Sequence, residues 1–139
     1  MRVSEIINRK GGEVVTLPPS AAVTELVQLL ADRRIGAVVV LEEQRLAGIV
    51  SERDIVHFVR KAGDPAATVA SIMTTEVITC HPSDDIAELA QVMTAKRIRH
   101  LPVVDGDALV AIVSIGDVVK GRLDELETER EHLENYIRS

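Results

Sequence analysis

The sequence GIVSERD at residues 48–54 returns as AIVSIGD at residues 111–117, and this recurrence decides the fold. The two stretches lie 63 positions apart, and at that offset residues 15–57 align with residues 78–120 without a gap. Fifteen of the 43 aligned positions are identical, a level that indicates an internal repeat. Two copies are too few for a solenoid, so we expect a closed pair whose halves cover each other's apolar faces.

The first copy predicts the element order β-α-β-β-α. Its expected elements lie at residues 13–17, 21–34, 37–41, 45–50 and 51–61. Apolar residues recur at helical spacing after Ser20, the expected N-cap, and Gly36 is expected to end the helix. The aliphatic run 37–41 does not alternate with polar residues, which is typical of a strand buried on both faces.

The second copy predicts the same order. Its expected elements lie at residues 77–80, 83–97, 101–104, 109–113 and from 114 onward. Asp105-Gly106-Asp107 between two aliphatic runs favours a β-hairpin, and residues 70–74 before this copy are expected to form a helical turn. We therefore predict an α+β fold with pseudo-two-fold symmetry: a first repeat at 1–62, a second at 68–122 and a helical tail at 123–139.

Composition limits the class of protein. The 139 residues include 16 basic and 22 acidic side chains, and Phe58 and Tyr136 are the only aromatic ones. An acidic surface repels phosphate backbones and two aromatic rings cannot form a stacking platform, so we expect no binding to nucleic-acid polymers. The lone Cys80, the absence of a long apolar run and the polar start Met1–Lys10 predict a cytoplasmic protein without membrane contact.

Both copies carry Ser-x-x-Asp where a strand gives way to a helix. The first N–H groups of a helix have no internal partner and attract anions, and Ser51 and Ser114 stand at that opening. Asp54 and Asp117 follow three residues later, and a carboxylate accepts two hydrogen bonds from a vicinal diol such as that of ribose. The alternative needs no ligand, because the same spacing forms a capping box.

Together with these stretches, further residues resemble the tandem CBS-domain pair, or Bateman module. They are Ile72-Met73-Thr74 and Leu101-Pro102-Val103-Val104-Asp105. The resemblance covers roughly residues 3–122 and is greatest to stand-alone CBS-pair proteins of bacteria and plant organelles. It implies a homodimer and a regulatory, energy-sensing module that binds an adenine nucleotide in the cleft between the repeats. AMP is the first expectation, with ATP or NAD(H) as alternatives, and the module would modulate an unidentified target protein.

The resemblance also implies which residues contact the nucleotide, because it pairs the aspartate of one copy with the strand entrance of the other. The expected main site comprises Ile35, Gly36, Ala37, Arg99, His100, Ile112, Ser114, Gly116 and Asp117. Arg99 would hold the phosphate with help from His100, and the small residues Gly36 and Ala37 would admit the adenine. The alternatives are a solvated strand-edge charge for Arg99 and a half-buried histidine for His100.

The expected second site is smaller. It comprises Ser51, Arg53, Asp54, Ile98 and Pro102. Arg53 would hold a further phosphate there, and the alternative is an ordinary exposed residue of a first helical turn. Because Gly36 and Ala37 of the first copy correspond to Arg99 and His100 of the second, the two sites are expected to be unequal. Histidines without ligand spacing and the absence of a phosphate-binding or nucleophile motif predict no metal site, no required cofactor and no catalytic residue.

The tail has a separate signal. Its apolar residues are spaced 4-3-7-4, a heptad seam, at Val119, Leu123, Leu126, Leu133 and Ile137. We expect this helix to pack in a dimer, and the alternative is a solvated helix that caps its own domain. A ligand-independent dimeric protein-interaction module is therefore the alternative function.

Overall fold

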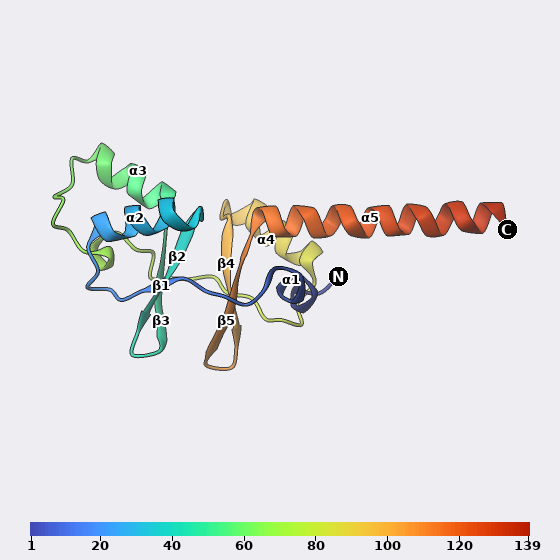
Figure 1. Ribbon diagram of the computed structural model, residues 1–139, viewed down its shortest axis with the longest axis horizontal. Helices are drawn as coiled ribbons and strands as arrows, with labels where there is room; N and C mark the ends of the chain where they lie inside the picture. The colour runs from blue at the N-terminus through green and yellow to red at the C-terminus, as the bar shows by residue number, and fades with distance from the viewer. The chain divides into compact units, whose positions relative to one another are not determined.

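The computed structural model describes residues 1–139, which form two compact units. Unit 1 comprises residues 1–12, 79–105 and 110–139, and unit 2 comprises residues 13–78 and 106–109 (Figure 1). Each unit is built around one repeat, but the first twelve residues pack with the second repeat rather than with the first. None of the helices combines the length and the hydropathy that crossing a bilayer requires.

Unit 2 contains a three-stranded sheet and two helices. Its elements are β1 (Thr16–Leu17), α2 (Val23–Arg33), β2 (Ala37–Glu42), β3 (Arg45–Ser51), α3 (Glu52–Arg60) and the 3₁₀ turn η1 (Val69–Ser71). The strand order is β1-β2-β3, with β1 parallel and β3 antiparallel to β2. Leu26, Val38, Val40 and Val50 are completely buried, which confirms that the aliphatic run forms the central strand of the core.

Unit 1 follows this plan with a two-stranded sheet and adds a helix. Its elements are α1 (Val3–Lys10), α4 (Ile86–Lys96), β4 (His100–Asp105), β5 (Ala108–Ser114) and α5 (Ile115–Arg138). Strand β4 pairs with β5, and Leu101, Val103 and Val113 are buried. The first turns of α5 pack against α4 and α1 through Val118 and Gly121, and its C-terminal half extends away from the rest of the unit (Figure 1).

The strand predicted at residues 77–80 is wrong, because only a single parallel bridge forms there, between Cys80 and Val103. Its counterpart in unit 2 is the pair Leu17–Val40, which is extended by Thr16–Val39. Pro102 stands where Val39 stands in the first copy. Proline has no N–H to donate, so the ladder cannot continue past that residue.

The predicted helix boundaries also differ in both repeats. The N-cap of α2 is Ala22, two residues after Ser20, because Ala21 N–H first closes a turn on the Pro18 carbonyl at 3.1 Å. In the second copy Asp85 caps α4 by accepting from Ala87 N–H at 2.8 Å. The left-handed residue that ends the helix is not Gly36 but Arg34 in unit 2 and Arg97 in unit 1, both at φ 54°.

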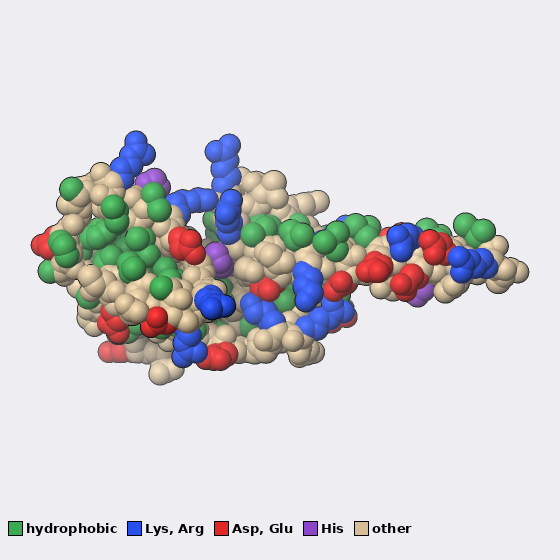
Figure 2. Space-filling model, turned by 45° about the horizontal axis from the view of Figure 1, so that its top comes forward, with side chains coloured by type: hydrophobic (Ala, Val, Ile, Leu, Met, Phe, Trp, Pro, Cys, Tyr) green, Lys and Arg blue, Asp and Glu red, His purple; other side chains and the backbone are tan.

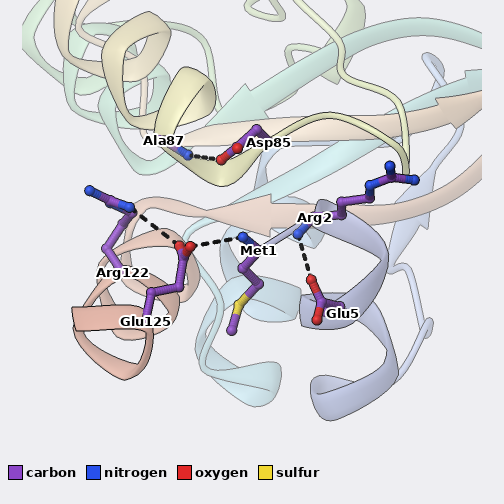
Figure 3. A network of polar contacts seen from close by, with 7 residues as sticks. All are labelled: Met1, Arg2, Glu5, Asp85, Ala87, Arg122 and Glu125. Atoms are coloured by element: carbon purple, nitrogen blue, oxygen red, sulfur yellow. Dashed lines mark hydrogen bonds and ion pairs between the residues drawn. The ribbon is translucent and has the colours of Figure 1, made fainter. Parts of the chain in front are cut away.

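The N-terminal helix is fixed to unit 1 at its start. Val3 and Ile6 are buried, and Val3 N–H donates to the Asp84 carbonyl at 2.9 Å. The Met1 ammonium donates to Glu125 Oε2 at 2.8 Å, and Figure 3 shows Arg122 approaching the same carboxylate. This hydrogen bond raises the pKa of the ammonium above its ordinary value. The contacts place the start of α1 directly against α5.

Candidate functional site

The start of α3 and the start of α5 are built in the same way. The first helical N–H of α3, from Glu52, donates to the Gly36 carbonyl at 3.1 Å. The equivalent N–H of α5, from Ile115, donates to the Arg99 carbonyl at 2.8 Å. In each unit this bond joins the entrance of the first hairpin strand (β2 or β4) to the first turn of the helix after the hairpin (α3 or α5), so the predicted residues at these two places lie close together.

We call these two groups half-sites. The unit 2 half-site comprises Ile35, Gly36, Ala37, Ser51, Arg53 and Asp54. The unit 1 half-site comprises Ile98, Arg99, His100, Pro102, Ile112, Ser114, Gly116 and Asp117. The predicted main and second sites each combine residues of both units, and these combinations stay predictions.

Both half-sites contain a capping box. Asp54 Oδ2 accepts from Ser51 N–H at 2.8 Å and from the Ser51 hydroxyl at 3.3 Å. Asp117 Oδ2 accepts from Ser114 N–H at 2.9 Å, and the Ser114 hydroxyl accepts from Asp117 N–H at 3.1 Å. The capping role is therefore present in both repeats. It also holds each carboxylate beside the first turn of its helix.

Asp117 has an additional partner that sequence reasoning did not identify. Lys10 Nζ lies 2.6 Å from Asp117 Oδ2 and donates to the Ile112 carbonyl at 2.9 Å. Burial alone would raise the pKa of the Asp117 carboxyl, but the hydrogen bonds from Lys10 and Ser114 lower it below its ordinary value. Asp117 is thus held in its charged form.

A sequence signal for Lys10 did exist. Val3, Ile6, Ile7 and Lys10 recur at i, i+3, i+4 and i+7, the spacing of one helical face, and Gly11 and Gly12 follow. The polar start at residues 1–10 argues against a signal peptide but is not among the helices predicted above, and α1 is a difference from that prediction. Helix α1, which was not predicted, brings the Lys10 ammonium to Asp117.

The residues of the strand entrances differ in exposure between the units. Ile35 and Gly36 are half-buried and Ala37 is buried. In unit 1, Arg99 is exposed and His100 is half-buried. The unit 2 entrance is therefore small and apolar, and the unit 1 entrance carries the cationic side chain.

The remaining predicted residues divide between surface and core. Gly116 is exposed, and a Cβ added to it would meet only the Ser114 hydroxyl, at 3.6 Å. At the equivalent position of α3 stands Arg53, which is also exposed. Pro102 is buried and its carbonyl accepts from Cys80 N–H at 3.0 Å, so its backbone is engaged in the core of unit 1.

Comparisons with known proteins agree with this duplicated architecture. The sequence model of the CBS domain matches twice, at residues 3–61 and 69–124. A mitochondrial CBS domain-containing protein of Arabidopsis thaliana is 34% identical over 146 aligned positions, which cover 97% of this chain and 71% of that protein.

Solved structures show the same fold. The crystal structure of a CBS-domain containing protein from Agrobacterium tumefaciens superposes with a TM-score of 0.84 at 38% identity, covering 87% of this chain and 92% of that chain. A CBS domain protein from Pyrobaculum aerophilum, complexed with AMP, superposes with a TM-score of 0.76 at 32% identity. That match covers 84% of this chain and 89% of the other.

Proposed function

This chain belongs to the CBS-domain family, and from that premise we propose that it is a regulatory module that binds an adenine nucleotide, AMP in the first place, and modulates a partner protein. The observation that carries the proposal is the pair of half-sites. In each, an aspartate and the positive end of a helix lie beside a strand entrance. The AMP complex of the relative from Pyrobaculum aerophilum supports the choice of ligand.

The chemistry of the half-sites supports a nucleotide rather than another anion. Asp54 and Asp117 provide acceptors for the two hydroxyl groups of a ribose. The positive end of the helix and the exposed Arg99 favour a phosphate. The small, apolar entrance at Ile35, Gly36 and Ala37 is suited to a flat ring that stacks without an aromatic partner.

Calorimetric titration of the full chain with AMP, ATP and NAD tests this function. We expect AMP to bind, and Asp117→Asn to weaken binding about tenfold or more, because the amide loses one acceptor and the charge. Asparagine still accepts from Ser114 N–H, so the helix start is preserved. The matched control is Asp107→Asn, an exposed position in the β4–β5 turn. Absence of heat for all three nucleotides would overturn the proposal.

The target protein and the location form the second part of the proposal. A pull-down with immobilised protein, with and without AMP, should recover a target whose amount changes with the nucleotide. We propose a cytoplasmic location, which the single free and buried Cys80 supports, since disulfides are rare there. Recovery of the tagged protein in an organelle fraction would contradict the location alone.

A dimeric interaction module that needs no ligand is the second candidate. The observation that favours it is the apolar seam of α5, at Val119, Leu123, Leu126, Leu133 and Ile137, where every side chain is at least half exposed. Figure 2 shows apolar side chains along the extended part of this helix. Sedimentation analysis tests it: Leu126→Gln with Leu133→Gln should give a monomer, whereas Glu127→Gln with Glu131→Gln should not change the mass. A wild-type monomer at all concentrations would reject the dimer.

A further inference from the structure

Lys10 brings a positive charge into the unit 1 half-site. It is the last residue of α1, and its Nζ donates to Asp117 Oδ2 at 2.6 Å and to the Ile112 carbonyl at 2.9 Å. The same carboxylate oxygen accepts from Ser114 N–H at 2.9 Å. Asp117 Oδ2 therefore has both of its lone pairs engaged.

The unit 2 half-site has no equivalent of this lysine. Asp54 Oδ2 accepts its two hydrogen bonds from Ser51, the residue that forms its own capping box. The difference follows from the topology, because Lys10 comes from α1, which packs in unit 1 and precedes both repeats in the sequence. The repeats are thus chemically unequal at the aspartate.

A vicinal diol donates two O–H groups and binds a carboxylate best when both oxygens can accept. We propose that Lys10 competes with the ribose diol for Asp117, so that a sugar can bind there only after the Lys10 ammonium is released. This inference rests on the proposed function, since it needs a ribose at Asp117. The Lys10 side chain is 34% exposed and that of Asp117 is 24% exposed. An ion pair that is this accessible to solvent contributes only modestly to stability, so a ligand can displace it.

Titration with adenosine tests the competition, because adenosine carries the diol but no phosphate that the released ammonium could bind. All proteins carry Asp54→Asn, so that the heat reports Asp117. Lys10→Met removes the charge and keeps the length of the side chain. The matched control is Arg9→Met on the same helix, whose guanidinium lies 2.8 Å from Asp124 and not at Asp117. Lys10→Arg is the conservative variant, which keeps the competing cation.

We expect Lys10→Met to bind adenosine about two- to fivefold more tightly than its parent, the range that corresponds to one partly exposed ion pair. Arg9→Met and Lys10→Arg should bind like the parent. As a second readout, saturating adenosine should speed the acylation of Lys10 by an N-hydroxysuccinimide ester, measured by mass spectrometry against the exposed Lys120. Faster acylation would report release of the ammonium directly.

The outcomes distinguish the competition at Asp117 from the proposed nucleotide binding. Unchanged or weaker adenosine binding by Lys10→Met would overturn the competition, because a weaker affinity would make Lys10 a ligand contact. A rate of Lys10 acylation that stays the same when adenosine saturates the protein would also overturn the competition. If wild-type protein gives no heat with AMP, ATP, NAD or adenosine, the proposed function itself fails.

Discussion

Replacing Gly48 with alanine tests whether the segment Met73–Thr74 is held tightly against β3. A Cβ at residue 48 would stand 2.8 Å from Met73 Sδ and 2.8 Å from the Thr74 carbonyl oxygen. The thioether can rotate away. The Thr74 carbonyl cannot, because it accepts from Ile49 N–H at 3.0 Å while Thr74 N–H donates to the Ile49 carbonyl at 2.9 Å. The segment must separate from β3 to admit the methyl group.

The expected magnitude follows from two opposing effects. Overfilling a packed site costs ~1–3 kcal/mol. Removing a glycine offsets part of this, ~0.5–1 kcal/mol, because the unfolded chain loses freedom. We expect Gly48→Ala to lower the free energy of unfolding by about 1–2 kcal/mol and Tm by about 3–8 °C.

Urea unfolding followed by far-ultraviolet circular dichroism measures the effect. The control is Gly116→Ala, where the added Cβ meets only the Ser114 hydroxyl at 3.6 Å, and we expect it to raise stability by up to ~1 kcal/mol. The reverse change in the other repeat, Ala111→Gly, empties a position that is 1% exposed and should cost about 1.5 kcal/mol. If Gly48→Ala is as stable as the wild type, the conclusion that Met73–Thr74 is held tightly against β3 is refuted.

Three further predictions concern the Cys80 thiol, the turn at Glu43-Gln44 and the Asp117 carboxylate. Burial raises the pKa of the Cys80 thiol to about 12, so iodoacetamide should modify the folded protein far more slowly than the urea-unfolded one; equal rates would contradict this. Glu43 and Gln44 both have positive φ, at 50° and 68°, so Gln44→Gly should raise the free energy of unfolding by ~0.5–1 kcal/mol; a lower urea midpoint would count against that conformation. The pKa of Asp117 is lowered in the folded state, so its contribution to stability is complete above the ordinary carboxyl value and is lost as pH falls through the folded value. The stability difference between wild type and Lys10→Met should therefore shrink between pH ~6 and pH ~3 in urea titrations, and a constant difference would contradict the ion pair.

The repeat made much of the fold predictable. Because residues 48–54 and 111–117 share Ser-x-x-Asp after an aliphatic run, both strand-to-helix turns could be placed to within a residue or two. The capping boxes of Ser51 and Ser114 follow from the same spacing and are confirmed. Local patterns were sufficient here, because each of these features depends on residues close together in the chain.

Features that depend on distant residues were not predicted. The loss of the strand at 77–80 is a consequence of Pro102 in its partner strand, so a pattern confined to one segment could not show it. The pairing of Lys10 with Asp117 joins residues 107 positions apart. The packing of α1 in unit 1 crosses the repeat boundary, which the offset of 63 does not describe.

The packing of α1 in unit 1 affects the order in which the chain folds during synthesis. The ribosome releases α1 before either repeat, but Val3 and Ile6 are buried in unit 1, where Val3 N–H bonds to the Asp84 carbonyl and the helix contacts α5. Unit 2, which is almost continuous in sequence, can collapse while α1 still exposes its apolar face. Helix α1 therefore emerges before both repeats but is among the last elements to reach its native contacts, and a nascent chain stalled before α5 should leave α1 accessible to chaperones and proteases.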